Sequence, residues 1–92
     1  MKVYTVKYTQ EAKKRIGKLD KSIQKIIQKA IDSLTRNPYK GKRLSYELAG
    51  LYSYRTSDYR IIYKIEEGQL IIIVITVGHR REIYKKLKEW IS

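Results

Sequence analysis

Basic residues interleaved with tyrosines over residues 52–64 are the first feature of this sequence that could do chemistry. Arg55, Arg60 and Lys64 alternate there with Tyr54 and further tyrosines. Arginine can hold a phosphate group through two parallel hydrogen bonds, and tyrosine offers a stacking ring and a hydroxyl. Interleaved cations and rings are typical of surfaces that bind single-stranded RNA. The same tyrosines also suit the interior of a sheet, because aromatic residues have high β propensity.

A second basic cluster, His79, Arg80, Arg81 and Tyr84, directly follows an apolar run. Side chains that come just after a rigid strand are held well enough to form a site. Histidine can take up a proton near neutral pH, whereas arginine stays protonated and can only hold an anion. A single histidine in a loop is often incidental, so the pattern leaves the role of His79 open.

The net charge points to an anionic partner. The 92 residues include 21 Lys and Arg against nine Asp and Glu, a formal net charge of +12. Nucleic acid, an anionic membrane or an acidic protein would each be attracted to such a chain. Part of this charge forms a regular series along one predicted helix, which indicates either a solvated helix face or a nucleic-acid docking surface: Lys18, Lys21, Lys25 and Lys29.

Composition excludes several kinds of site. Without cysteine the chain has no disulfide, no thiolate zinc site and no thiol nucleophile. Its single histidine and scattered glycines exclude a histidine-rich metal site and a phosphate-binding glycine loop. The longest apolar run, Leu70 to Ile75, is far shorter than the roughly 20 residues that cross a bilayer. We therefore expect a cytoplasmic protein with no metal, no cofactor and no membrane partner.

The first half of the chain predicts one strand and two helices. Residues 2–8 alternate as a strand does, and Thr9 can cap a first helix. Asp20 or Ser22 can cap a second helix, whose apolar residues over 23–34 keep helical spacing throughout. The one proline of the chain ends this helix, because the residue before a proline disfavours helical backbone.

The second half predicts three strands in a meander. They are expected over residues 51–56, 59–65 and 70–77, and the last is apolar enough to be covered on both faces in the middle of a sheet. Gly68 suits the positive φ of the turn before this last strand. Gly78 is expected to end the strand.

A short helix over residues 81–90 closes the chain, with Ile83, Leu87 and Trp90 as its inward stripe. Helices gathered before a run of antiparallel strands indicate the α+β class. We expect residues 1–92 to form a single domain with the order β-α-α-β-β-β plus the C-terminal helix, its two N-terminal helices packed on a small antiparallel sheet.

Three segments together resemble the RelE/ParE superfamily of bacterial and archaeal toxins. They are Leu48–Arg55 with the sequence LAGLYSYR, Asp58–Tyr63 with DYRIIY, and Val77–Tyr84 with VGHRREIY. Each segment alone would be a weak signal, but their combination and the order of elements cover nearly the whole chain. The resemblance implies a RelE-like fold, similar to that of small microbial ribonucleases.

The resemblance also implies the toxin of a type II toxin–antitoxin pair. The RelE branch cuts messenger RNA in the ribosomal decoding site without a metal, and the 2′-hydroxyl of the RNA serves as nucleophile. The ParE branch shares the fold but poisons DNA gyrase. Toxins of both branches are silenced by a proteic antitoxin. The expected partners are an acidic, RelB-like antitoxin in a hetero-oligomeric complex, and the ribosome with its messenger RNA.

Site residues follow from the same resemblance by position. Arg60 matches the strand arginine that contacts the scissile phosphate, and Arg80 matches the arginine after the central strand. Tyr84 matches the C-terminal tyrosine that stacks on the substrate nucleotide or helps to activate it. Arg55 and His79 fall at places where such toxins often carry a basic residue.

The sequence departs from the family pattern on the second strand. The RelE type has two lysines there, and this chain has Ser53 and Arg55. No carboxylate matches the glutamate that the YoeB-like branch offers as a base. The general base is therefore open among Tyr84, His79 and a lysine.

The combined prediction is a metal-independent, ribosome-dependent endoribonuclease that inhibits translation. One alternative is a gyrase poison of ParE type, which needs none of the catalytic residues. Another is a basic module that binds RNA or an antitoxin and cuts nothing. The residues expected to bind RNA around the catalytic group are Lys42, Arg43, Tyr54, Lys64 and Arg81.

Overall fold

The computed structural model describes residues 3–44 and 46–91, except for the side chains of Tyr46, Trp90 and Ile91. The predicted α+β class is confirmed, and the inward position expected for Trp90 lies outside the described side chains. The described helices and strands are β1 (Thr5–Tyr8), α1 (Gln10–Gly17), α2 (Lys21–Arg36), β2 (Lys42–Arg43), β3 (Leu51–Thr56), β4 (Tyr59–Glu66), β5 (Ile71–His79) and α3 (Arg80–Ile91).

The two N-terminal helices begin where the sequence signals lie. The Thr9 hydroxyl caps α1 by accepting from the amide of Ala12 at 3.1 Å, and it donates to the carbonyl of Ile75 at 2.6 Å. Asp20 takes the N-cap position of α2, and Asn37 is its C-cap. The predicted apolar stripe of α2 faces the sheet, with four of its residues buried: Ile27, Ala30, Ile31 and Leu34.

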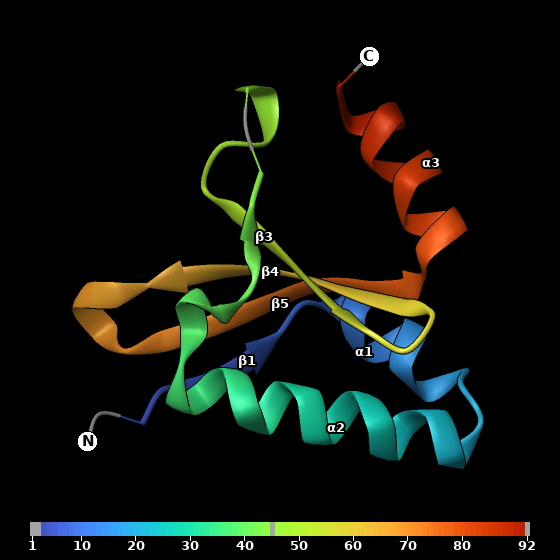
Figure 1. Ribbon diagram of the computed structural model, residues 1–92, viewed down its shortest axis with the longest axis horizontal. Coiled ribbons are helices and arrows are strands. Elements are labelled where there is room, and N and C mark those ends of the chain that lie inside the picture. The colour runs from blue at the N-terminus through green and yellow to red at the C-terminus, as the bar shows by residue number, and fades with distance from the viewer. Residues whose placement is uncertain (1–2, 45, 92) are drawn as a thin grey trace.

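The strands form one mixed sheet in the order β1-β5-β4-β3-β2, and the labels of β1, β5, β4 and β3 follow one another upward in Figure 1. Strands β2 to β5 are antiparallel neighbours. Strand β1 instead runs parallel to β5, with Thr5 opposite Ile71, so the sheet is not antiparallel throughout as expected. A parallel pair needs a long crossover, and α1 and α2 together belong to the segment that provides it.

Strand β2 lies inside the segment that the sequence predicts to be a plain connection. Lys42 pairs with Ser53 of β3, and Arg43 pairs with Tyr52. A strand of two residues is too short to show the alternation from which strands are recognised.

Both glycine predictions in the meander were wrong. The turn before β5 is a 3-10 turn over Glu67–Gln69, and the residue with positive φ is Leu70, at 54°, rather than Gly68. Gly78 does not end β5, which continues to His79 and passes directly into α3. Gly78 instead lets Ile83 pack closely against the backbone of β5, because a Cβ at this position would lie only 3.2 Å from Cδ1 of Ile83.

The sheet has two unequal faces. The face toward α1 and α2 carries the main core, which includes Ile61, Tyr63 and Val74. The opposite face carries a smaller core in which Ile62 packs with Ile83 and Leu87 of α3. Figure 1 shows α3 and the β2–β3 segment rising from this second face, on the side away from α2. The second face is therefore only partly covered and has room for polar side chains.

The completely buried ring of Tyr63 holds the connection after α2 in place. Its hydroxyl donates to the carbonyl of Pro38 at 2.6 Å and accepts from the amide of Gly41 at 3.1 Å. Burial raises the pKa of Tyr63 to about 12, so the phenol stays protonated and can donate at neutral pH. The two hydrogen bonds satisfy backbone groups that would otherwise lie unpaired beside the core.

Replacing Tyr63 by phenylalanine is expected to destabilise the fold by roughly 1–3 kcal/mol, because a buried carbonyl and an amide lose their partner. The free energy of unfolding in urea measures this change. Tyr54→Phe is the matched control, since no hydrogen bond of its hydroxyl occurs within the described residues. Equal stability of Tyr63→Phe and the parent would show that the hydroxyl contributes nothing to the fold.

Candidate active site

The β3–β4 hairpin brings two predicted catalytic arginines together. Its turn is formed by Ser57 and Asp58, and the register places Arg55 directly opposite Arg60. Side chains opposite each other on one face have Cβ atoms about 5 Å apart, and like charges so placed are destabilising. The structure thus places both arginines on the second face of the sheet, with Nε of Arg55 donating to the carbonyl of Ser57 in the turn at 3.3 Å.

Arg60 is the half-buried centre of this group. Its Nη1 donates to Oγ of Ser53 at 3.0 Å, and its Cζ lies 5.3 Å from the ring centroid of Tyr84. This distance is within the range of a cation–π contact. The Nε atom is shielded from solvent and has no hydrogen-bond partner among the described residues. A buried donor without a partner is costly, and an anion bound to Arg60 would satisfy it.

Helix α3 brings Tyr84 to this place because β5 allows a close approach. Gly78 lies opposite Arg60 in the ladder, and Ile83 packs against the bare backbone there. The following residue, Tyr84, turns toward Arg60 and keeps 48% of its surface exposed. We call the residues Ser53, Arg55, Arg60 and Gly78 the arginine face, over which Tyr84 forms one wall.

Other predicted cations lie beside the arginine face. Lys42 is opposite Ser53 and is exposed, whereas Lys64 lies further along β4 and pairs with Glu66 at 3.0 Å. Within the residues that the structure describes, neither Arg55 nor Arg60 pairs with a carboxylate. Positive charge on this face is therefore left available for an anionic ligand.

Arg80 lies at the end of the sheet where the β3–β4 turn is. It is the first residue of α3, and its amide donates to the carbonyl of Asp58 at 2.8 Å. This bond joins α3 to the turn between the strands of Arg55 and Arg60. The side chain of Arg80 is exposed.

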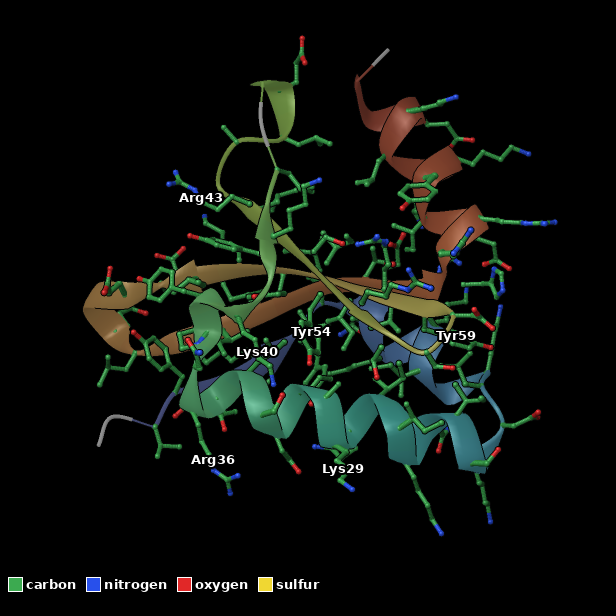
Figure 2. All side chains as sticks on the ribbon, viewed as in Figure 1. Lys29, Arg36, Lys40, Arg43, Tyr54 and Tyr59 are labelled. Carbon is green, nitrogen blue, oxygen red and sulfur yellow. The ribbon has the colours of Figure 1, made fainter. Side chains whose placement is uncertain are left out.

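Three predicted residues lie away from the arginine face. His79 is opposite Tyr59, with ring centroids 5.7 Å apart, and alternation turns both away from the face that Arg60 occupies. Tyr54 packs against the main core on the side of α2, and the ammonium of Lys40 lies 5.4 Å from its ring centroid (Figure 2). Arg43 points outward from β2 in the same view.

Arg81 takes its place at the start of α3, where it is exposed. Its amide donates to Nδ1 of His79 at 3.4 Å. This is a long hydrogen bond, and it turns the imidazole back toward the helix backbone. His79 and Arg81 thus contact each other rather than the arginine face.

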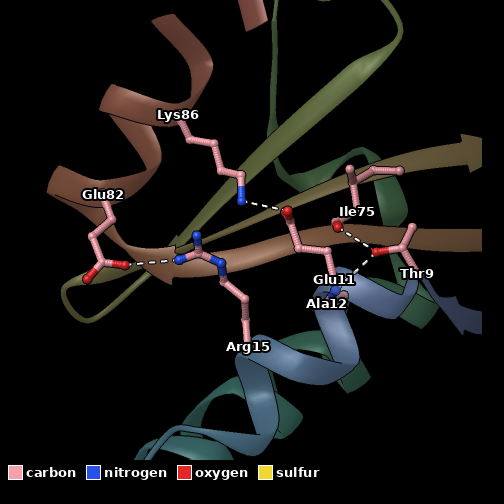
Figure 3. Close-up of polar contacts among 7 residues, drawn as sticks. All are labelled: Thr9, Glu11, Ala12, Arg15, Ile75, Glu82 and Lys86. Atoms are coloured by element: carbon pink, nitrogen blue, oxygen red, sulfur yellow. Dashed lines mark hydrogen bonds and ion pairs between the residues drawn. The ribbon is translucent and has the colours of Figure 1, made fainter. Parts of the chain in front are cut away.

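Arg15 of α1 is a neighbour of the site that the sequence analysis missed. Its Nη1 lies 3.6 Å from the point where a Cβ of Gly78 would stand, and it pairs with Glu82 of α3 at 3.0 Å. An open cleft of about 480 Å³ separates α1 from α3, and Arg15, Gly78, His79 and Glu82 are among its lining residues. Figure 3 shows this ion pair, and that of Lys86 with Glu11, crossing between the two helices.

Two searches of the described residues bear on the kind of site. The described residues contain no group of three or more His, Cys, Asp or Glu side chains that could hold a metal ion. None of the helices described is long and apolar enough to span a bilayer.

Known proteins resemble this chain over most of its length. Residues 6–84 match the family described as the ParE toxin of the type II toxin–antitoxin system parDE. The toxin RelG of Mycobacterium tuberculosis is 35% identical over 85 residues, which are 90% of this chain and 98% of that relative. The toxin RelE of the same organism is 31% identical over 84 residues, covering 89% and 87%.

Solved structures agree with the fold. The toxin–antitoxin complex RelBE2 from Mycobacterium tuberculosis matches with a TM-score of 0.78 and 35% identity, over 85% of this chain and 99% of that chain. The isolated RelE toxin of E. coli matches with a TM-score of 0.72 over 97% and 99%. Its identity of 22% makes this a likeness of fold alone.

Proposed function

This chain belongs to the ParE toxin family of type II toxin–antitoxin systems, a toxin of the RelE/ParE superfamily, and we propose that it cuts messenger RNA in the decoding site of the ribosome. The observation that carries the proposal is the Arg60 guanidinium. Its buried Nε lacks a partner among the described residues, and the ring of Tyr84 lies against it. In this proposal residues 1–92 act as one toxin domain.

The proposed reaction is an internal transfer in the RNA. The 2′-oxygen attacks the adjacent phosphorus, the bond from phosphorus to the 5′-oxygen breaks, and a 2′,3′-cyclic phosphate and a 5′-hydroxyl result. One proton leaves the 2′-hydroxyl and one is delivered to the 5′-oxygen, so no oxidant, water or cofactor is consumed. Negative charge builds on the phosphate oxygens, where Arg60 and Arg55 would hold it.

Tyr84 is the group we assign to the nucleotide. Its exposed ring can stack on a base, and its hydroxyl can take part in moving a proton. Arginine cannot serve as base, because its pKa exceeds about 12. A site with many cations and no strong base gains most from substrate that is already placed, and the ribosome would supply that placement.

His79→Ala is expected to leave cleavage nearly unchanged, because His79 lies on the other face of β5 with Tyr59. The loss of a general base lowers the rate by roughly 10²–10⁴-fold, so the measurement can tell a His79 that acts as base from one that takes no part in cleavage. Single-turnover cleavage on stalled ribosomes is the measurement. A loss of about 10²-fold would return His79 to the role of base.

The partner that we propose is an antitoxin. The similar chain of the RelBE2 complex was solved with its antitoxin, and the charge of +12 here favours an acidic binder. We propose a hetero-oligomeric complex of the two proteins that keeps the toxin silent. A toxin that acts on the ribosome and its message would work in the cytoplasm, and this is the location that we propose.

A gyrase poison remains the second candidate, since the matching family is described as ParE toxin. The deciding experiment incubates the purified protein with ribosomes stalled on a defined message, and primer extension maps the new ends. Naked RNA, and gyrase with supercoiled DNA, are parallel reactions. A new end in the decoding-site codon that naked RNA lacks supports the proposal. Trapped gyrase–DNA cleavage with no cut on the ribosome would replace it with the ParE activity.

A further inference from the structure

Helix α3 is fixed to the rest of the molecule along a narrow line. Ile83 and Leu87, one turn apart, are its described side chains that enter the smaller core. Successive residues of a helix are turned by about 100°, so the residues beside this line point to its two flanks. Tyr84 lies on one flank, and Glu82 and Lys86 lie on the other.

Two ion pairs join the second flank to α1 across the open cleft (Figure 3). Nζ of Lys86 lies 2.6 Å from Oε1 of Glu11, and Nη1 of Arg15 lies 3.0 Å from Oε2 of Glu82. The two helices pair in antiparallel order, because Glu11, near the start of α1, meets Lys86, which lies further along α3 than Glu82. Lys86 keeps only 18% of its side chain exposed, which shields that pair from solvent.

We propose that these two ion pairs hold α3 in the rotation that puts Tyr84 over Arg60. Glu11, Arg15, Glu82 and Lys86 are then positioning residues for the cleavage proposed above, on which this inference rests. We call the four residues the α1–α3 clamp. None of them needs to touch the RNA for the clamp to act.

The physical reason is that α3 can rotate about the line of its two apolar contacts, Ile83 and Leu87. A helix held by Ile83 and Leu87 alone can roll, and a roll that opens the cleft moves Tyr84 relative to Arg60. Burial would raise the pKa of Glu11, but the contact with the Lys86 ammonium and the nearby positive charge of Arg15 outweigh it and lower that pKa. The carboxylate is therefore ionised at neutral pH and can pair with Lys86. Exposed pairs are individually weak, so two pairs acting together suit a holding function.

The test removes the one anion and the one cation that α3 contributes to the clamp, with Glu82→Gln/Lys86→Met. Cleavage is followed under single turnover on stalled ribosomes, at saturating ribosome concentration. The expected rate is about threefold to tenfold lower, the size of two modest ion pairs, while the ribosome concentration for half-maximal rate stays within about twofold. Lys86→Arg keeps the charge and should keep the rate. Lys85→Met, which removes an exposed lysine from the same helix, is the matched control.

A second set of variants asks whether the clamp acts through Tyr84. In a Tyr84→Ala background, Glu82→Gln/Lys86→Met should cause no further loss, because there is no ring left to position. An equal additional loss in that background, or a loss that appears only in ribosome binding, would overturn the proposal. So would a parent-like rate in the double variant.

Amide hydrogen exchange of α3 separates this inference from the proposed function. The clamp predicts faster exchange over Arg80–Ile91 in Glu82→Gln/Lys86→Met than in Lys85→Met, whether or not RNA is cut. Unchanged exchange would overturn the clamp itself. If the parent chain cuts nothing on the ribosome, the proposed function and the catalytic consequence of the clamp fall together, while exchange still decides whether the ion pairs hold α3.

Discussion

Arg60→Ala is expected to abolish growth arrest when the chain is expressed without its antitoxin, and to lower single-turnover cleavage on the ribosome by roughly 10²–10³-fold, the loss typical of a donor aimed at developing charge. The reason is the geometry around Arg60. Its guanidinium lies between Ser53 and the ring of Tyr84, with a buried Nε that no described group satisfies. Arg60→Lys should recover only part of the rate, because an ammonium cannot hold two phosphate oxygens at once.

Arg36→Ala is the matched control for the change in charge. Arg36 ends α2 and points away from the sheet in Figure 2, on the side opposite the arginine face. Its removal lowers the net charge by the same amount and should leave cleavage near the parent value. Urea unfolding of both variants checks that each is folded. A folded Arg60→Ala protein as toxic as the parent would remove Arg60 from the site.

Tyr84→Ala is expected to slow single-turnover cleavage by about 10²-fold, a typical loss for one group that acts in the transition state, while ribosome affinity changes by less than about threefold. The cleavage rate is expected to fall much more than the ribosome affinity because of where Tyr84 lies. Tyr84 is a single ring beside Arg60, whereas docking of the whole protein depends on charge spread over the surface. Tyr84→Phe keeps the ring over Arg60 and should lose about tenfold, the share of the hydroxyl.

Tyr39→Ala is the control for Tyr84→Ala. Both tyrosines are 48% exposed, but Tyr39 lies in the turn after α2 and its ring contacts Tyr52. The control should cleave like the parent. Equal losses in rate and in affinity for Tyr84→Ala would make Tyr84 a docking residue, and the arginines alone would then carry the charge stabilisation.

Local sequence patterns predicted part of the fold correctly and part of it wrongly. The boundaries of β3 and α2 follow directly from alternation, from helical spacing and from the proline after Asn37. The opposition of Arg55 and Arg60 is also readable in the sequence, because a two-residue turn pairs the residues that flank it symmetrically. Local patterns failed at Gly68 and Gly78, where a glycine looked like a turn signal but the backbone or a neighbouring side chain decided otherwise.

The pairing of β1 with β5 and the short strand β2 could not be predicted in this way. Their partners lie far away in the sequence, and strand pairing depends on which edges the rest of the chain leaves free. The same holds for Arg15. Its helix shows an acid and a base four residues apart, and α3 shows the same pattern, but only the approach of the two helices makes these charges a pair.

The α+β class, the helices, the hairpin that joins Arg55 to Arg60, and the family could all be predicted from the sequence, because each depends on residues close together or on a motif read in order. Which of the candidate residues share a face depends instead on how the elements pack. The tertiary structure brought Tyr84 to Arg60 through the close contact of Ile83 with Gly78, and it turned His79 and Tyr54 to the other side. The physical reason is that alternation along a strand separates neighbours in sequence, while packing of α3 on the sheet joins residues that the chain keeps apart.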